Sequence, residues 1–114
     1  MTDCLAQIEW HDLPLESIRI GSTGIDLHVT PFDREKGRYQ DFYLFIFNPQ
    51  SIEIKAEGHL SLERLKNLEI AEFEYEFIGD LISGTIGIIP GGADVGYWKI
   101  EFKKANWKLT SSGS

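Results

Sequence analysis

Three glutamates are the side chains with the most evident capacity for chemistry. Glu72, Glu74 and Glu76 alternate with the apolar residues that run from Ala71 to Phe77. Successive side chains of a β-strand point to opposite faces, so the three carboxylates share one face. Carboxylates serve as acid–base catalysts in enclosed sites, whereas an outward-facing row on a sheet offers no enclosure. The spacing therefore predicts an acidic binding face, and the sequence identifies no catalytic residue.

The histidines and the single cysteine do not form a metal-binding pattern. His28 and His59 are isolated, and neither they nor Cys4 show the close spacing of a zinc site. The sequence predicts no metal and no cofactor. His11 and Asp12 adjoin each other before the first expected strand and form a candidate local site. The alternative is that Asp12 fixes the turn while His11 hydrogen-bonds backbone.

The glutamates lie on the first of three expected strands that form one unit. Gly79 and Asp80 predict a two-residue hairpin turn between residues 68–78 and 81–89. This register places Tyr75 opposite Gly84, and it predicts two further pairs, Phe73 with Ile86 and Ala71 with Ile88. Residues 97–103 form the third strand after a loop at 91–95. Matching the apolar faces predicts the pairs Trp98 with Ile88, Ile100 with Ile86, and Phe102 with Gly84.

The outer face of this three-stranded unit has short side chains in its middle row. The row consists of Ser83, Thr85 and Gly87, and it lies between the glutamates and a mixed row of Lys99, Glu101 and Lys103. This arrangement predicts a shallow furrow with an acidic wall. The alternative is a solvated face with weak cross-strand charge pairs.

The first half of the chain adds further strands. Residues 15–20 and 25–29 alternate and predict a hairpin through the turn at 21–24. Residues 41–47 are nearly all apolar, and the turn signal at 48–51 predicts a hairpin that pairs Phe47 with Ile52. That pairing leaves a second apolar face uncovered, formed by Phe42, Leu44 and Ile46. Other parts of the chain or a second subunit must cover this face, so it is a candidate homodimer interface.

These elements predict an all-β fold, an antiparallel meander that forms a sandwich or a strongly curved, barrel-like sheet, with the sandwich preferred. At most one short helix is expected near residues 61–67, where leucines recur at helical spacing. Residues 1–109 form one β domain, and residues 110–114 are expected to be a disordered tail.

The charge balance narrows the possible partners. The chain of 114 residues has a net charge of −7, with an acidic body and a basic C-terminal strand from Lys99 onward. An acidic body argues against binding nucleic acid and favours a basic protein partner, or serves solubility alone. We find no signal-peptide pattern and no apolar run of membrane-spanning length, so no membrane association and a cytoplasmic location are expected.

The segment from Trp10 to Ile20 resembles the start of a broad group of small bacterial β-rich proteins, with a His–Asp pair before an Ile-x-Ile strand. The segment from Ile70 to Glu76 is similar in style. Several members of that group are immunity proteins of polymorphic toxin systems. The resemblance implies a stoichiometric protein-binding role without a catalytic site.

Two functional hypotheses follow from the sequence. The first is a non-enzymatic protein-binding module, specifically an immunity protein that neutralises a basic toxin or nuclease through Glu72, Glu74 and Glu76. The second is a small-molecule-binding or enzymatic β-barrel. Its cavity would be lined by Tyr43, Phe45 and Tyr75, with a histidine at the mouth.

Overall fold

The computed structural model describes residues 4–58, 68–90 and 96–112. Within them the fold is all-β and antiparallel, as predicted. The strands are β1 (Leu13–Gly21), β2 (Gly24–Val29), β3 (Phe32–Asp33), β4 (Arg38–Tyr39), β5 (Asp41–Phe47), β6 (Ser51–Gly58), β7 (Leu68–Ile78), β8 (Leu81–Pro90) and β9 (Gly96–Ser112), preceded by the 3₁₀ helix η1 (Cys4–Gln7). The short helix expected near 61–67 lies outside the described residues. No described helix has the length and apolar character needed to cross a membrane.

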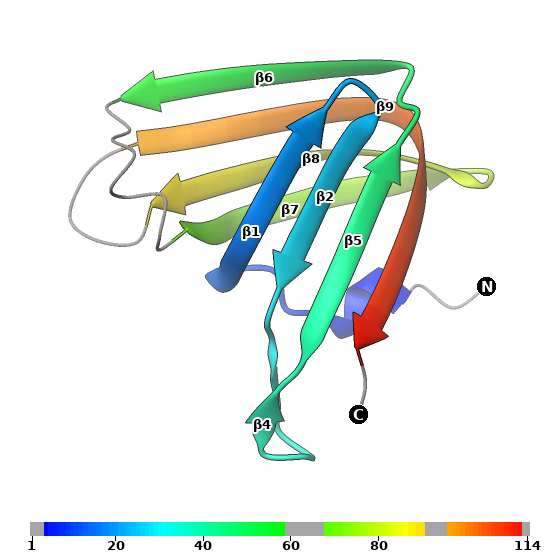
Figure 1. The fold of residues 1–114 in the computed structure, drawn as a ribbon. Helices are drawn as coiled ribbons and strands as arrows, with labels where there is room; N and C mark the ends of the chain where they lie inside the picture. Colours follow the sequence, from blue (N-terminus) through cyan, green and yellow to red (C-terminus); the bar gives the residue numbers. More distant parts are fainter. Residues whose placement is uncertain (1–3, 59–67, 91–95, 113–114) are drawn as a thin grey trace.

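The main sheet closes on itself. Its strand order is β5-β2-β1-β7-β8-β9-β6, and an additional pairing joins β5 to β9. Figure 1 shows β1, β2 and β5 in front, β7 and β8 behind them, and β9 curving from the rear sheet round to β5. The preferred sandwich is therefore wrong and the barrel-like alternative is correct. The small sheet β3–β4 projects below the ring as a hairpin arm.

The register of β7, β8 and β9 confirms most of the predicted pairs. Tyr75 lies opposite Gly84, and Phe102 lies opposite Gly84 on the other side. The prediction fails at Ala71, because Ile88 pairs with Ile70 and the register shifts between Ile70 and Glu72. One extra residue in a strand forms a β-bulge, which interrupts the alternation of faces. The loop at 91–95 lies outside the described residues.

The hairpin predicted between β5 and β6 does not form. Both strands pair with β9 along the same side, β5 through Phe47 opposite Asn106 and β6 through Ser51 opposite Lys103. They therefore continue in one direction, end to end. Asn48 adopts a left-handed conformation with φ of 52°. This residue turns the backbone from β5 into β6, the next strand along β9, instead of reversing it into a hairpin.

β9 bends where it passes from β6 to β5. Lys104 has φ of 49°, and its N–H donates to the Ser83 hydroxyl oxygen at 2.9 Å. The pairing with β8 shifts at the same point, between Ile82 and Gly84. Beyond the bend β9 continues to Ser112, which pairs with Asp41. The predicted disordered tail is thus wrong for residues 110–112, while residues 113 and 114 lie outside the described range.

A continuous apolar core fills the ring. Leu44 and Ile46 of β5 have no exposed surface and pack with inward-facing residues of β1, β2, β7, β8 and β9. Phe42 is partly buried against the same core. The candidate interface of Phe42, Leu44 and Ile46 is therefore corrected to ordinary core, covered by the chain's own strands. The segment around η1 adds Leu5 to this core, together with Trp10, whose indole N–H donates to the Leu5 carbonyl oxygen at 3.0 Å.

Candidate binding furrow

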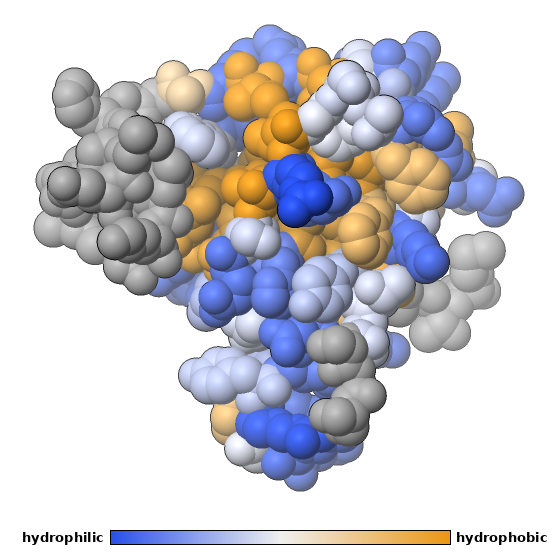
Figure 2. Space-filling view, in the orientation of Figure 1, coloured by the Kyte–Doolittle hydropathy of each residue, from blue (hydrophilic) through white to orange (hydrophobic). Residues whose placement is uncertain are grey.

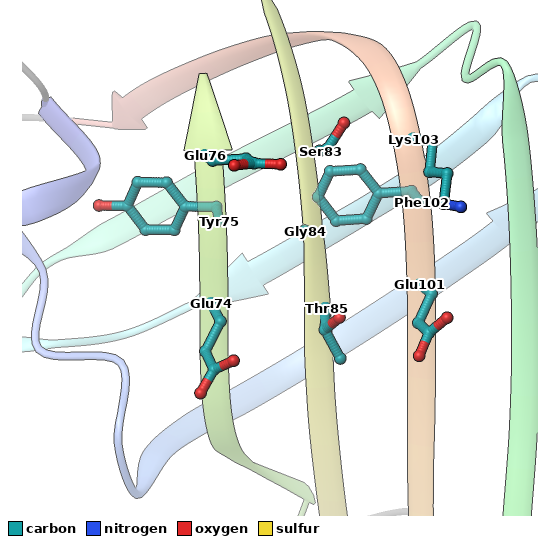
Figure 3. A pocket seen from close by; sticks show the side chains of 9 residues that line it. All are labelled: Glu74, Tyr75, Glu76, Ser83, Gly84, Thr85, Glu101, Phe102 and Lys103. Carbon is teal, nitrogen blue, oxygen red and sulfur yellow. The ribbon is translucent and has the colours of Figure 1, made fainter. Parts of the chain in front are cut away.

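The outer face of β7, β8 and β9 carries the predicted furrow. A depression of about 320 Å³ lies on this face. Figure 3 shows its lining from the three strands: Glu74, Tyr75 and Glu76 from β7, Ser83, Gly84 and Thr85 from β8, and Glu101, Phe102 and Lys103 from β9. Short side chains of β8 form the low middle, and longer charged side chains rise on both sides. The short side chains of β8 between longer neighbours thus form a shallow, open depression.

Gly84 holds the three strands close beneath the furrow. A Cβ atom at this position would lie 2.5 Å from the Glu74 carbonyl oxygen and 3.1 Å from the Phe102 ring. The missing side chain lets the Phe102 ring cover β8 at this position, with the Tyr75 Cβ atom close on the other side. Glycine is otherwise unfavourable inside a strand, and this aromatic cover offsets the weakness.

A hydrogen bond across β8 closes one end of the furrow. The Tyr97 hydroxyl donates to Glu72 Oε1 at 2.7 Å. The Tyr97 side chain crosses Gly87, where a Cβ atom would lie 2.5 Å from the tyrosine hydroxyl oxygen. Gly87 is therefore buried on an outer face. Of the three predicted glutamates, Glu72 is thus engaged in this crossing, and only Glu74 and Glu76 line the hollow.

The carboxylates on the two sides of the furrow differ in whether they have a charged partner. Glu101 Oε1 lies 3.5 Å from Lys99 Nζ on the same strand. Glu74 and Glu76 are exposed, and neither forms a hydrogen bond or ion pair with the residues that the structure describes. In Figure 3 the Glu76 side chain turns toward Ser83, across the furrow from Lys103. The β7 wall is therefore a pair of carboxylates available to a cation.

The predicted local site at His11 and Asp12 has a structural explanation. A carbonyl oxygen accepts only, so His11 Nδ1 carries the hydrogen in its 2.8 Å bond to the Ala71 carbonyl oxygen. Ala71 is the extra residue of the β7 bulge. Asp12 has φ of 60° and lies in the turn that leads into β1, where the Leu13 N–H donates to the Trp10 carbonyl oxygen. The two residues hold β7 and the start of β1 in place.

Among the described residues, the three aromatic side chains of the second hypothesis do not come together. Tyr43 lies on the outer face of β5, where its ring stacks on His28 with centroids 4.5 Å apart. Phe45 shares that outer face because it is two residues further along the strand. Tyr75 packs instead against the core cluster. His28 also contacts Asp41 through Nε2 at 2.8 Å, and His59 lies outside the described residues. The three aromatic residues do not line one cavity.

The hairpin arm was missed as an accessible aromatic feature. Phe32 and Tyr39 pair edge to face on the arm with ring centroids 5.1 Å apart, and both are exposed. Hollows of about 430 and 410 Å³ border its base, and Arg34 lines both. The second hollow also includes His11 and Asp12. Figure 2 shows a mostly hydrophilic surface over the arm. The sequence signal for this arm was one aromatic residue on each side of the charged segment 33–38, Phe32 before it and Tyr39 after it.

Metal-ligating side chains are dispersed over the part of the chain that the structure describes. There, no group of three or more histidine, cysteine, aspartate or glutamate residues is close enough to hold an ion. No protein-family model, curated protein or solved structure matches this chain.

Proposed function

We propose that this protein is a non-enzymatic binding module that receives a basic segment of a protein partner in the furrow of β7, β8 and β9. The observation that carries the proposal is the β7 wall. Glu74 and Glu76 line a hollow of about 320 Å³ without a described partner for either carboxylate. A lysine or arginine side chain laid along β8 would approach both.

The physical properties of the furrow support this kind of occupant. Its low middle row, which contains Ser83 and Thr85, gives a long side chain room to lie flat between the walls of β7 and β9. Arginine and lysine bury their apolar stems while their charged ends stay near water. The overall charge of −7 adds long-range attraction for a basic surface, which raises the association rate.

An immunity protein that blocks a basic toxin or nuclease is the specific form of this proposal. The resemblance of residues 10–20 to such proteins motivates it, and it would place the protein in the cytoplasm of a bacterium. Because His11 and Asp12 hold β7 and β1, the resemblance concerns the scaffold of the furrow. The acidic wall supplies the contact, occupying the toxin as its nucleic-acid substrate would.

Binding of a lysine- and arginine-rich peptide to matched variants tests the furrow. We expect Glu74→Gln with Glu76→Gln to weaken binding about tenfold at low salt, since each lost charge pair contributes up to about 1 kcal/mol. The control is Glu9→Gln with Glu35→Gln, which changes the net charge equally at exposed sites outside the furrow. Fluorescence anisotropy of the labelled peptide measures both affinities over a salt series.

If both double variants weaken peptide binding equally, the furrow is not the binding site, because the attraction then depends on net charge alone. Lys103→Glu should have the opposite effect on peptide affinity. This substitution removes the cation from the furrow and should tighten peptide binding. Capture of partners from a bacterial lysate with wild-type protein and with Glu74→Gln/Glu76→Gln as bait then connects the furrow to a natural partner.

A further inference from the structure

Within the described residues, β6 is the last strand in the order of the main sheet and forms an open edge. One side of β6 pairs with β9 along its whole length, from Ser51 opposite Lys103 to Gly58 opposite Gly96. No strand in the described part of the chain pairs with its other side. In Figure 1 this edge runs along the top of the molecule, with no labelled strand beyond it. The outward backbone groups of such an edge are a template for another strand.

The side chains of β6 leave apolar surface beside that edge. Ile52 and Ile54 are 38% and 46% exposed although they continue the inner face of β9, opposite Phe102 and Ile100. The next residue on this face, Ala56, lies opposite Trp98. Figure 2 shows that apolar surface extends to the upper rim, where β6 runs in Figure 1. An edge strand in solution usually carries charge on such positions, and β6 does not.

The charges on the other face of β6 are poorly matched within the chain. Glu53 lies opposite Glu101, and Lys55 lies opposite Lys99. Like charges directly opposite each other destabilise a strand pair. Lys55 instead forms an ion pair on its own strand, with Nζ 3.6 Å from Glu53 Oε1. The pairing with β9 therefore leaves the charge pattern of β6 without a complementary row.

A second copy of β6 would supply the complementary row of charges. If two copies run antiparallel about a two-fold axis at Ile54, Glu53 of each chain faces Lys55 of the other. In the same register Ile54 faces Ile54, and Ile52 faces Ala56. Apolar residues thus meet on one face and opposite charges on the other. An axis at Glu53 or Lys55 would instead place identical charges opposite each other.

We propose that this protein forms a homodimer through antiparallel pairing of β6 with β6 of a second copy, with the two-fold axis at Ile54. The interface is isologous, as in most homodimers. Backbone hydrogen bonds between the edges contribute affinity, and the row of Glu53 and Lys55 fixes the register. This inference is independent of the furrow's occupant, because the furrow lies on β7, β8 and β9.

Charge exchange at two positions tests the register directly. Glu53→Lys alone places lysine opposite Lys55 of the partner, and Lys55→Glu alone places glutamate opposite Glu53. We expect each single variant to weaken its own homodimer about tenfold to a hundredfold. A mixture of the two should form a heterodimer at near wild-type affinity, since every facing pair is again opposite in charge. Sedimentation velocity and native mass spectrometry measure the three states.

A disulfide cross-link tests the position of the two-fold axis. In a Cys4→Ser background, Ile54→Cys places two thiols opposite each other, within the Cα separation that a disulfide requires. Ile52→Cys is the matched control on the same face. Its two copies would be about 14 Å apart along the strands, which is too far to bridge. Oxidised glutathione should therefore cross-link the Ile54→Cys protein and leave the Ile52→Cys protein monomeric on a non-reducing gel.

Several outcomes would overturn the dimer. Wild-type protein that sediments as a monomer at every concentration excludes it, and so do single charge variants that dimerise as well as wild type. Equal cross-linking of Ile52→Cys and Ile54→Cys would show contact without the proposed register. Circular dichroism of each variant establishes that the ring is folded, so that a lost dimer reports on the interface.

Discussion

β5 and β6 lie end to end along β9, yet one is core and the other is edge. Each has apolar residues at alternate positions that continue the inner face of the sheet. Leu44 and Ile46 of β5 are fully buried, whereas Ile52 and Ile54 of β6 remain substantially exposed. β5 has a second neighbour, β2, while β6 has none in the described part of the chain. Burial of a strand therefore follows from its number of neighbours more than from its own pattern.

The largest expected effect comes from truncating one side chain in each strand. Leu44→Ala should lower the free energy of unfolding by about 2–5 kcal/mol, because it leaves a cavity in the core. Ile54→Ala should lower it by less than about 1 kcal/mol, because its side chain is half exposed. Urea denaturation of dilute protein measures both. A similar loss from the two truncations would mean that β6 is as enclosed as β5.

The second neighbour of β5 can be disturbed directly. A Cβ atom on Gly24 of β2 would lie 2.0 Å from the Ile46 carbonyl oxygen, and this glycine has φ of 153°. Gly24→Ala should therefore cost about 1–3 kcal/mol by forcing β2 and β5 apart. Gly21→Ala is the control in the same hairpin, since its Cβ would meet no atom within 4 Å. Thermal unfolding should separate the two variants clearly.

A smaller loss of stability is expected from disturbing the bend in β9, which separates the part paired with β6 from the part paired with β5. Ser83→Ala removes the acceptor for the Lys104 N–H, and the expected loss is about 0.5–1.5 kcal/mol. Ser51→Ala, at an exposed position on β6, should change stability little. If urea denaturation finds the two serine variants equivalent, the bend at Lys104 does not depend on this hydrogen bond.

The smallest expected effect concerns the mismatched charges of β6. Exchanging both residues, with Glu53→Lys and Lys55→Glu together, places opposite charges across from Glu101 and Lys99. The free energy of unfolding of the monomer should rise by about 0.5–1 kcal/mol at low salt and return toward wild type at high salt. A gain that salt does not reduce would point away from electrostatics.

Local patterns predicted the meander of β7, β8 and β9 well. Apolar residues alternate from Phe73 to Phe77, and Gly79 with Asp80 marks the turn to β8, so the predicted register is correct for most inward side chains. The same alternation located the furrow, because Ser83 and Thr85 are short and their neighbours long. The bulge at Ala71 was not predicted, because a small apolar residue between Ile70 and Glu72 fits the inner face as well as an inserted position.

Long-range pairing was the part that sequence patterns could not supply. Asn48 and Pro49 indicate that the backbone leaves regular strand geometry, but they do not tell which direction it takes next. A hairpin and a change of direction between successive strands along one partner share that signal. The partner of β5 lies far along the chain in β9, and nothing local to Leu44 identifies Leu109 as its neighbour. The tail from residue 110 was predicted to be disordered because its partner strand, β5, is equally distant in the sequence.

The dependence of β5 and β6 on β9 has a consequence for folding kinetics. During synthesis β5 emerges with only β2 to pair with, and β6 has no partner until β9 follows. Closing the ring joins Leu44 to Leu109, so much of the chain must be ordered before the pairing stabilises it. Contacts of such long sequence separation slow folding, typically into milliseconds to seconds. Until then the apolar face of β5 is open to solvent, and this interval is when a nascent chain is most exposed to aggregation.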